Sequence, residues 1–314
     1  MKTPAVSVVM AVYNGQEYLN IAIDSILMQS FKDFELVIVN DGSSDSTESI
    51  INTYSDPRIV YVSQKNAGLA NALNTGIAKA KGKYIARMDA DDVAYFDRLK
   101  LQSEYLDKHK KVGLVGTSYD VIEENNVIID GSYHLDQPND LKLEFLVRNP
   151  FGHGTIMARA EAFEKVGGYD PEQIVEDYEL WWRISKHFQV ANIANKLYAW
   201  RVVSNGISHS GSEKRQIPIS NLMSLIWQKS DVKLPTSKEI LASASHYDAL
   251  GEKYLEQYKY MLAAITIALF NKKRYRQSLR LYSVLTIKLG AKNILKDLTK
   301  SPRSHNYNLS NLKK

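Results

Sequence analysis

Three aspartates lie within four positions at Asp89-Ala90-Asp91-Asp92, directly after an apolar run that ends at Met88. Carboxylates this close repel one another unless a cation holds them. The chain has no cysteine and no clustered histidine, and hard oxygen ligands of this kind suit Mg²⁺ or Mn²⁺ bridging phosphate oxygens. The same residues also suit a solvated acidic turn that caps the next helix. Taken alone, the motif leaves both interpretations open.

Two further polar segments are candidates for binding an anion or a nucleotide. Asp41, in the run NDGSSD, can accept a hydrogen bond from the imide N–H of a uracil or from a ribose hydroxyl, or can form a plain Asx turn before a helix. Lys65, Asn66, Gly68 and Asn71 place a cation, amides and a glycine where a helix begins. These groups suit a closely approaching anionic ligand, or they cap the helix.

The elements that position these residues are predicted to be buried parallel strands. Val6–Tyr13 and Phe34–Asn40 are continuous apolar, β-branched runs, typical of strands buried on both faces. Ile59–Ser63 and Lys83–Met88 continue the series, with helical stretches between them, which predicts right-handed βαβ units in a doubly wound sheet. Ligands of such sheets bind beyond the carboxyl ends of the strands. The polar segments all fall at that edge, which favours one ligand site over three unrelated turns.

The pattern loosens after residue 111 and becomes helical beyond Ser210. The middle region is predicted to complete the sheet and cover one end of it, with strands at Val112–Tyr119, Val127–Tyr133 and His153–Ala158, helices at Asp140–Arg148 and Tyr178–His187, and extended structure over Gln189–Val203.

Five stretches of the chain, in order, resemble the family 2 glycosyltransferases of the GT-A fold, an inverting group that builds bacterial polysaccharides and glycoconjugates. They run from Val6 to about Lys186: VSVVMAVYNGQEYL, SILMQSFKDFELVIVNDGSSDST, NAGLANALNTGIAKAKGKYIARMDADD, HGTIMARAEAFEKVGGYD and EDYELWWRISK. The resemblance implies an α/β fold with a doubly wound, mostly parallel sheet. It also implies transfer of a sugar from a nucleotide-diphosphate donor to an acceptor hydroxyl of a saccharide or lipid-linked saccharide, and the expected donor is a UDP-sugar.

The resemblance also implies a role for particular residues. Asp91 of the Asp89-Ala90-Asp91 motif would bind the divalent metal, Mn²⁺ or Mg²⁺, and Asp177 would be the catalytic base. The residues implied in donor binding are Ala11, Tyr13, Asp41, Lys65, Asn66, Gly68, Asn71, Arg87, Asp89 and Arg201. The residues implied on the acceptor side are His153, Glu176, Trp181 and Trp182.

Elementary chemistry agrees with this division of labour. Inversion at an anomeric carbon needs one carboxylate to take the proton of the attacking hydroxyl. It also needs a cation to neutralise the charge that builds on the leaving diphosphate. Each acceptor-side residue has an ordinary structural interpretation as well: Glu176 and Asp177 as the acidic first turn of a helix, the tryptophans as core packing, and His153 as a structural histidine.

The chain departs from the family at one position. Relatives often carry an aromatic-Arg-x-His pattern near the end of the catalytic core, where the histidine helps to bind metal or diphosphate. Here the run is Trp200-Arg201-Val202-Val203, so Val203 stands in the place of the histidine. His209 is near enough in sequence to substitute for it.

Charge divides the chain into two regions. Residues 1–210 hold 21 Lys/Arg against 28 Asp/Glu, whereas residues 211–314 hold 19 against 7. We therefore predict a catalytic domain over 1–210 and a basic helical region over 211–314. That region is expected to form a helical subdomain with some affinity for anionic membrane through its tail, while no recognition motif supports nucleic-acid binding.

The sequence shows neither a signal peptide nor a run of the roughly 20 apolar residues that spans a bilayer, so a cytoplasmic location is expected. A peripheral position on the inner face of the cell membrane is the accompanying expectation. Two rival functions remain. A nucleotidyltransferase would usually carry a glycine-rich basic loop directly after the first strand, which Tyr13-Asn14-Gly15 does not provide. A non-catalytic nucleotide-sugar-binding or scaffold protein would bind UDP without turnover.

Overall fold

The computed structural model describes residues 3–203 and 234–271, together with positions 222, 225, 226, 281 and 289. The chain forms two compact units, Met1–Ser132 with Phe151–Ser210, and Tyr133–Pro150 with Gly211–Lys314. This division differs from the predicted one because Tyr133–Pro150, which the prediction placed in the catalytic domain, belongs to the second unit.

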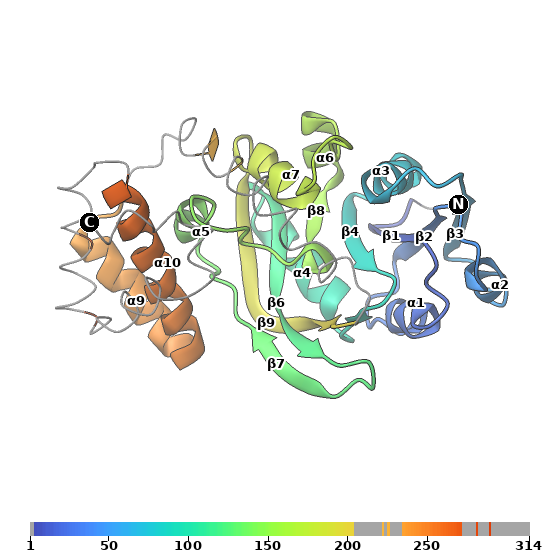
Figure 1. Ribbon diagram of the computed structural model, residues 1–314, viewed down its shortest axis with the longest axis horizontal. Helices are drawn as coiled ribbons and strands as arrows, with labels where there is room; N and C mark the ends of the chain where they lie inside the picture. The colour runs from blue at the N-terminus through green and yellow to red at the C-terminus, as the bar shows by residue number, and fades with distance from the viewer. Residues whose placement is uncertain are drawn as a thin grey trace. The chain divides into compact units, whose positions relative to one another are not determined.

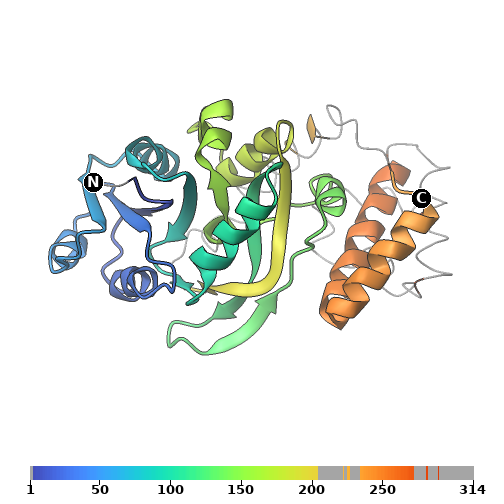
Figure 2. The ribbon, with the colours of Figure 1, turned by 180° about the vertical axis from the view of Figure 1, so that it is seen from behind.

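The first unit is built on the predicted parallel sheet (Figures 1 and 2). Strands β3 (Ile59–Ser63), β2 (Phe34–Asn40), β1 (Val6–Val12) and β4 (Tyr84–Asp89) lie side by side in that order, all parallel. This part of the fold prediction is confirmed. Because the four strands run in one direction, their carboxyl ends meet at one edge.

Beyond β4 the sheet continues with mixed directions. The short strand β8 (Met157–Arg159) is antiparallel to both β4 and β6 (Val112–Ile122), and the long strand β9 (Gln189–Arg201) runs parallel to β6. β7 (Ile128–Ser132) pairs with β6, and β5 (Val93–Ala94) pairs with β9. The strand predicted over His153–Ala158 is wrong in its first half, since His153–Thr155 forms a 3-10 turn.

Helices cover both faces of the parallel strands (Figures 1 and 2). Alternate residues of the strands point to opposite faces. Val8 and Met10 therefore pack in the cluster that contains Ile23 of α1, whereas Val37 packs with Ala72 of α3. The helices of this unit are α1 (Leu19–Leu27), α2 (Thr47–Ile51), α3 (Leu69–Lys79), α4 (Arg98–Lys108), α6 (Ala160–Val166) and α7 (Glu176–Ser185).

The described part of the second unit is helical, with α5 (Pro138–Glu144), α9 (Ser237–Leu250) and α10 (Glu252–Asn271). Polar contacts join α5 and its preceding turn to α9: Asp136 lies 2.8 Å from His246, and the Tyr247 hydroxyl donates to Asp140 at 3.1 Å. Among the described helices, none is both long enough and apolar enough to cross a bilayer. The basic segment that begins at Lys272 lies almost wholly outside the described residues.

Candidate active site

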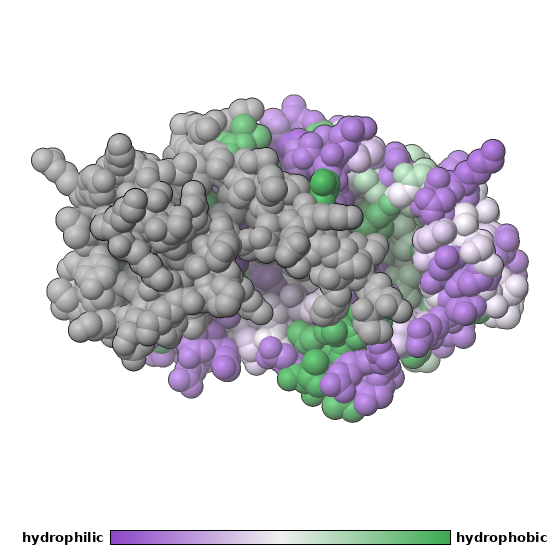
Figure 3. All heavy atoms as spheres, viewed as in Figure 1, coloured by the Kyte–Doolittle hydropathy of each residue, from purple (hydrophilic) through white to green (hydrophobic). Residues whose placement is uncertain are grey.

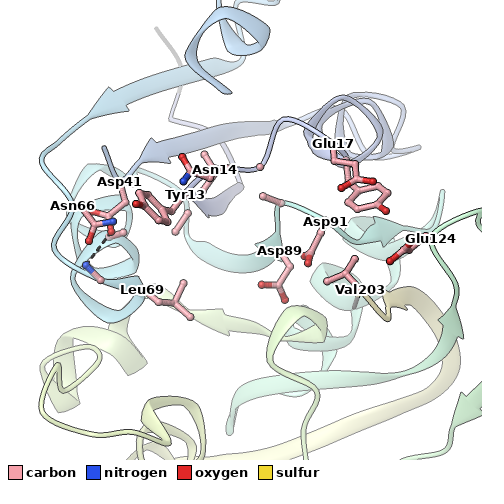
Figure 4. Close-up of a pocket in the computed structure, with 17 residues that line it drawn as sticks. Tyr13, Asn14, Glu17, Asp41, Asn66, Leu69, Asp89, Asp91, Glu124 and Val203 are labelled. Atoms are coloured by element: carbon pink, nitrogen blue, oxygen red, sulfur yellow. Dashed lines mark hydrogen bonds between the residues drawn. The ribbon is translucent and has the colours of Figure 1, made fainter. Parts of the chain in front are cut away.

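A cavity of about 680 Å³ opens at the carboxyl ends of β1, β2 and β4 (Figure 4), within the size range of small-molecule sites. Of the predicted site residues, the lining includes Ala11, Tyr13, Asp41, Asn66, Gly68, Asp89 and Asp91. The structure therefore brings the three polar segments of the sequence together at one site.

Reciprocal hydrogen bonds between two loops hold Tyr13 at the cavity. Asn14, with a left-handed φ of 52° that asparagine tolerates, donates its N–H to Ser43 Oγ and accepts the Ser44 N–H on its side chain, at 2.9 and 2.8 Å. Gly15 N–H donates to Thr47 Oγ1 at 2.9 Å. The loops after β1 and β2 thus form one rigid rim. Tyr13 remains 55% exposed on this rim, so its ring is available to a flat ligand such as a nucleobase.

Asp41 organises the part of the cavity wall at the start of α3. Its buried carboxylate accepts from Gln64 Nε2 at 2.7 Å and from the backbone N–H groups of Ala67 and Gly68, each at 2.9 Å. The residue after it, Gly42, has a φ of +73°, and a Cβ there would lie 2.7 Å from the Asn66 nitrogen, so the loop can approach this closely only at a glycine. Asp41 therefore fixes the start of α3 while it lines the cavity.

The acidic motif at the end of β4 places its three carboxylates in three environments. Asp89 lines the cavity and forms an ion pair with the buried guanidinium of Arg87. Asp91 also lines the cavity; burial raises its pKa, against the attraction of Arg87. Asp92 is fully buried, and burial together with the charge of Asp91 raises its pKa to about 7, although it accepts hydrogen bonds from Tyr198 and from the Arg201 backbone.

Arg201 lies behind this motif and outside the cavity lining. It is 1% exposed, and its Nε donates to the Asp91 carbonyl at 2.7 Å. The other guanidinium nitrogens donate to the turn between β6 and β7: to the Glu123 and Glu124 carbonyls at 3.0 and 3.1 Å and to Asn126 Oδ1 at 2.7 Å. The guanidinium also lies over the Tyr18 ring, 4.4 Å from its centroid. The expectation that Arg201 binds donor phosphate is therefore corrected, because its guanidinium nitrogens already donate hydrogen bonds to backbone and side-chain oxygens of the protein.

We expect Arg201→Lys to lower the free energy of unfolding by roughly 3 kcal/mol, because a lysine keeps the charge but cannot reach four separate acceptors from one plane. Thermal or urea unfolding of the two proteins measures the loss. Lys196→Arg, which keeps the more exposed ion pair with Asp120, serves as the matched control and should unfold like the parent. Equal stability of Arg201→Lys and the parent would show that the observed contacts contribute little.

The segment that carries the predicted acceptor-side residue His153 packs against Asp89. A Cβ at Gly154 would lie 2.9 Å from Asp89 Oδ2, so this segment packs directly against the cavity carboxylate. The neighbouring His153 places its Nδ1 4.0 Å from Glu176 Oε1, at the start of α7. Burial and the charge of Arg87 hold the pKa of His153 well below its usual value. Residues 153 and 154 therefore lie between the Asp89 carboxylate and the Glu176-Asp177 pair.

Other predicted residues lie elsewhere. Trp181 and Trp182 are 0% and 8% exposed, so neither ring is available to stack on an acceptor sugar, and the core-packing interpretation holds for both. Lys65 and Asn71 are exposed outside the cavity lining, where the Asn71 side chain donates to the Ala67 carbonyl. Val203, in the place of the family histidine, does line the cavity, whereas His209 lies outside the described residues.

Sequence reasoning missed part of the lining. The unpredicted residues are Val12, Asn14, Gly15, Glu17, Tyr18, Leu69, Ala72, Ala90, Glu124 and Val203. Glu17 and Tyr18 follow Tyr13 within the first matching stretch, and their place in that stretch is the signal that points to them. Glu124 comes from the turn before β7, and no local signal in the sequence points to it.

The lining chemistry suits a hard divalent cation. Among the described residues, the cavity is lined by five carboxylates, from Glu17, Asp41, Asp89, Asp91 and Glu124, and by no Lys or Arg. A diphosphate would be repelled by such a wall unless a cation entered with it. In the described part of the chain no three His, Cys, Asp or Glu side chains surround a common point. Mg²⁺ is commonly held by one or two carboxylates together with substrate phosphates and water, and Asp91 in the cavity lining could be one such carboxylate.

Comparison with known proteins identifies the class. The sequence pattern of glycosyl transferase family 2 matches residues 7–167, more than half of the chain. Solved structures support the fold. The chain is similar to Staphylococcus aureus TarS 1–349 in complex with UDP-GlcNAc, with a TM-score of 0.62 at 14% identity over 94% of this chain and 91% of that one. It is also similar to the Pyrobaculum calidifontis mannosyltransferase PcManGT in complex with GDP-Man and Mn²⁺, with a TM-score of 0.56 at 19% identity over 99% and 88%.

The chain therefore belongs to glycosyl transferase family 2, and it is a glycosyltransferase with the GT-A fold. Among curated proteins, it is 37% identical over 207 residues to the glycosyltransferase EpsE of Bacillus subtilis, covering 63% of this chain and 73% of EpsE. It is 36% identical to the O-antigen biosynthesis glycosyltransferase WbnJ of Escherichia coli, over 57% and 71%. A Rickettsia prowazekii glycosyltransferase is 35% identical, and the match spans 61% of its length.

Proposed function

We propose that this enzyme is an inverting, metal-dependent transferase that moves a sugar from a UDP-sugar to an acceptor hydroxyl during assembly of bacterial cell-surface polysaccharide or glycolipid. The observation that carries the proposal is the contact between the cavity carboxylate Asp89 and the segment that leads to Glu176 and Asp177. Gly154 packs on the Asp89 carboxylate, and its neighbour His153 lies beside Glu176. A donor bound beside Asp89 and an acceptor bound beside Glu176 and Asp177 would therefore lie close together.

In this proposal the donor base stacks on Tyr13 and is bordered by Asp41. Tyr13 is exposed at the cavity, and Asp41 lies near it at the start of α3 (Figure 4). The sugar and diphosphate would then extend toward Asp89 and Asp91. The WbnJ name and the UDP-GlcNAc in the TarS complex support a sugar nucleotide donor and a role in surface polysaccharide.

Asp177 would remove the proton from the acceptor hydroxyl as its oxygen attacks the anomeric carbon. The bond from that carbon to the diphosphate breaks on the opposite face, which inverts the configuration and leaves the proton on Asp177. Asp89 and Asp91 would hold a divalent cation, which neutralises the charge of the departing diphosphate. Burial of Asp92 and Arg201 behind the motif keeps the Asp91 backbone in place.

An apolar surface beside the cavity supports an acceptor that carries a lipid. Val127, Ile128 and Ile129 are each more than half exposed, and Figure 3 shows apolar atoms gathered over β7. The turn before β7 also supplies Glu124 to the cavity lining. A lipid-linked saccharide whose apolar chain rests on this hairpin would present its sugar hydroxyl near the site.

A panel of nucleotide-sugars tests the donor assignment. Calorimetry with UDP-, GDP- and dTDP-sugars, each with and without Mn²⁺, should show binding of a UDP-sugar that weakens by roughly 10-fold or more without the metal, because the acidic lining then faces the diphosphate directly. Anomeric analysis of the product by NMR then decides between inversion and retention. Equal binding in the presence of EDTA would exclude the metal requirement, and preference for GDP would exclude the uridine assignment.

A further inference from the structure

Two helices hold the loop formed by residues 166–169 from opposite sides. On one side, Asn74 of α3 donates its Nδ2 to the Tyr169 carbonyl at 2.8 Å and accepts the Tyr169 N–H on Oδ1 at 2.9 Å. On the other side, Arg183 of α7 donates to the carbonyls of Val166 and Gly168 at 2.6 and 2.7 Å. The 166–169 loop therefore joins α3 to α7 through side-chain contacts with its backbone.

The approach of Asn74 to this loop is close and specific. Gly168 has a φ of +76°, and a Cβ at this position would lie 2.6 Å from Asn74 Oδ1. An asparagine amide presents one donor and one acceptor in a plane, which matches the N–H and C=O of the single residue Tyr169. Alanine would leave both partly buried backbone groups of Tyr169 without their partners.

The Tyr169 side chain contacts the residues of the acceptor side. Its side chain is 3% exposed, and its hydroxyl lies 2.8 Å from His153 Nε2. Its ring and the His153 ring both pack edge-on against Trp181 of α7, at centroid distances of 6.0 and 5.9 Å. His153 in turn lies beside Glu176. The place of the Tyr169 ring therefore fixes His153 and the first turn of α7, which carries Glu176 and Asp177.

The other end of the connection reaches the donor cavity. Leu69 and Ala72 of α3 line that cavity, and the N–H of Gly68, which precedes the helix, is bound by Asp41. Asn74 lies on the same helix, two residues after Ala72. One helix, α3, therefore lines the cavity and also hydrogen-bonds to the loop that positions the acceptor-side carboxylates.

We infer that Asn74 is a positioning residue for sugar transfer: it holds the acceptor-side carboxylates of α7 at a fixed place relative to donor bound beside α3. The inference rests on the proposed function of the same site. Asn74 touches neither donor nor acceptor, so its loss is expected to slow the transfer step while leaving donor binding unchanged. Misplacement of a reacting group by about 1 Å costs roughly 10²-fold in rate.

The test compares Asn74→Ala with the parent in full-length protein, with kcat, KM for donor and acceptor, and the Kd for UDP measured separately. We expect kcat to fall roughly 10- to 100-fold with the Kd for UDP unchanged. Tyr169→Phe, which removes only the hydroxyl contact with His153, should also lower kcat. If both residues act through one path, the double variant loses less than the product of the two single losses.

Ser7→Ala is the matched control. The Ser7 hydroxyl accepts the backbone N–H groups of Lys81 and Gly82 at 3.1 and 2.8 Å, beyond the other end of α3, and takes no part in the site. Both variants should lower the melting temperature, but only Asn74→Ala should lower kcat. Equal kcat in the two variants, or a weaker Kd for UDP that accounts for the whole loss in Asn74→Ala, would overturn the inference. Absence of transfer by the parent with every nucleotide-sugar would instead overturn the proposed function.

Discussion

Asp177→Asn is expected to lower kcat for transfer by roughly 10³-fold, because an amide cannot take the proton of the acceptor hydroxyl and a positioned general base contributes about 10²- to 10⁴-fold. The Kd for the nucleotide-sugar should not change, since Asp177 lies outside the lining of the cavity proposed to bind the donor. Glu176 and Glu179 still provide negative charge at the start of α7, so the favourable interaction of acidic side chains with this helix end is largely kept.

Two companion variants make this result specific. Glu172→Gln removes a carboxylate from the exposed segment just before α7 and should transfer at the parent rate. Glu176→Gln changes the neighbour that lies beside His153 and should retain most of the activity. A collapse of activity in Glu176→Gln with normal turnover in Asp177→Asn would move the base to Glu176 and contradict the assignment. Initial rates at saturating donor and acceptor, followed by release of UDP, measure all three variants.

The sequence predicted the parallel half of the fold well because its signals are local. Val6–Val12 and Phe34–Asn40 are apolar on both faces, so each can only be a strand covered on two sides, and parallel strands bring Asp41 and Asp89 to one edge. The short strand β5 had no comparable signal, because its two residues are defined only by pairing with β9. Likewise, the pattern over His153–Ala158 did not distinguish a 3-10 turn from a strand.

The roles of buried polar residues could not be predicted from the sequence, because their partners are distant along the chain. Arg201 was assigned to the donor because an arginine near the end of a catalytic core suits a diphosphate. Three of its acceptors come from the turn before β7 and the fourth is the Asp91 carbonyl; all are separated from it by 75 or more positions and become neighbours only in the folded sheet. The membership of Tyr133–Pro150 in the second unit has the same origin, since contacts such as Asp140 with Tyr247 span 107 positions. Composition and periodicity carry no information about such pairings.

Asp91→Ala is expected to abolish the effect of Mn²⁺ on donor binding and to lower transfer by roughly 10²- to 10³-fold, the loss typical of removing one group that stabilises developing charge. The physical reason is the acidic lining. Among the described residues it offers carboxylates and no cation to the diphosphate, so in the proposed mechanism a metal held at Asp91 would supply the attraction.

The folded state should not suffer from this substitution, because Asp91 and the buried Asp92 are adjacent carboxylates whose repulsion the change removes. Calorimetric titration of UDP at increasing Mn²⁺, beside thermal unfolding, separates the two effects. Glu104→Ala, an exposed carboxylate on α4 away from the lining, is the control and should keep the metal response. If Asp91→Ala still bound UDP more tightly with each addition of Mn²⁺, the cation would have to be held by other oxygens, with Glu124, which also lines the cavity, as the first to replace.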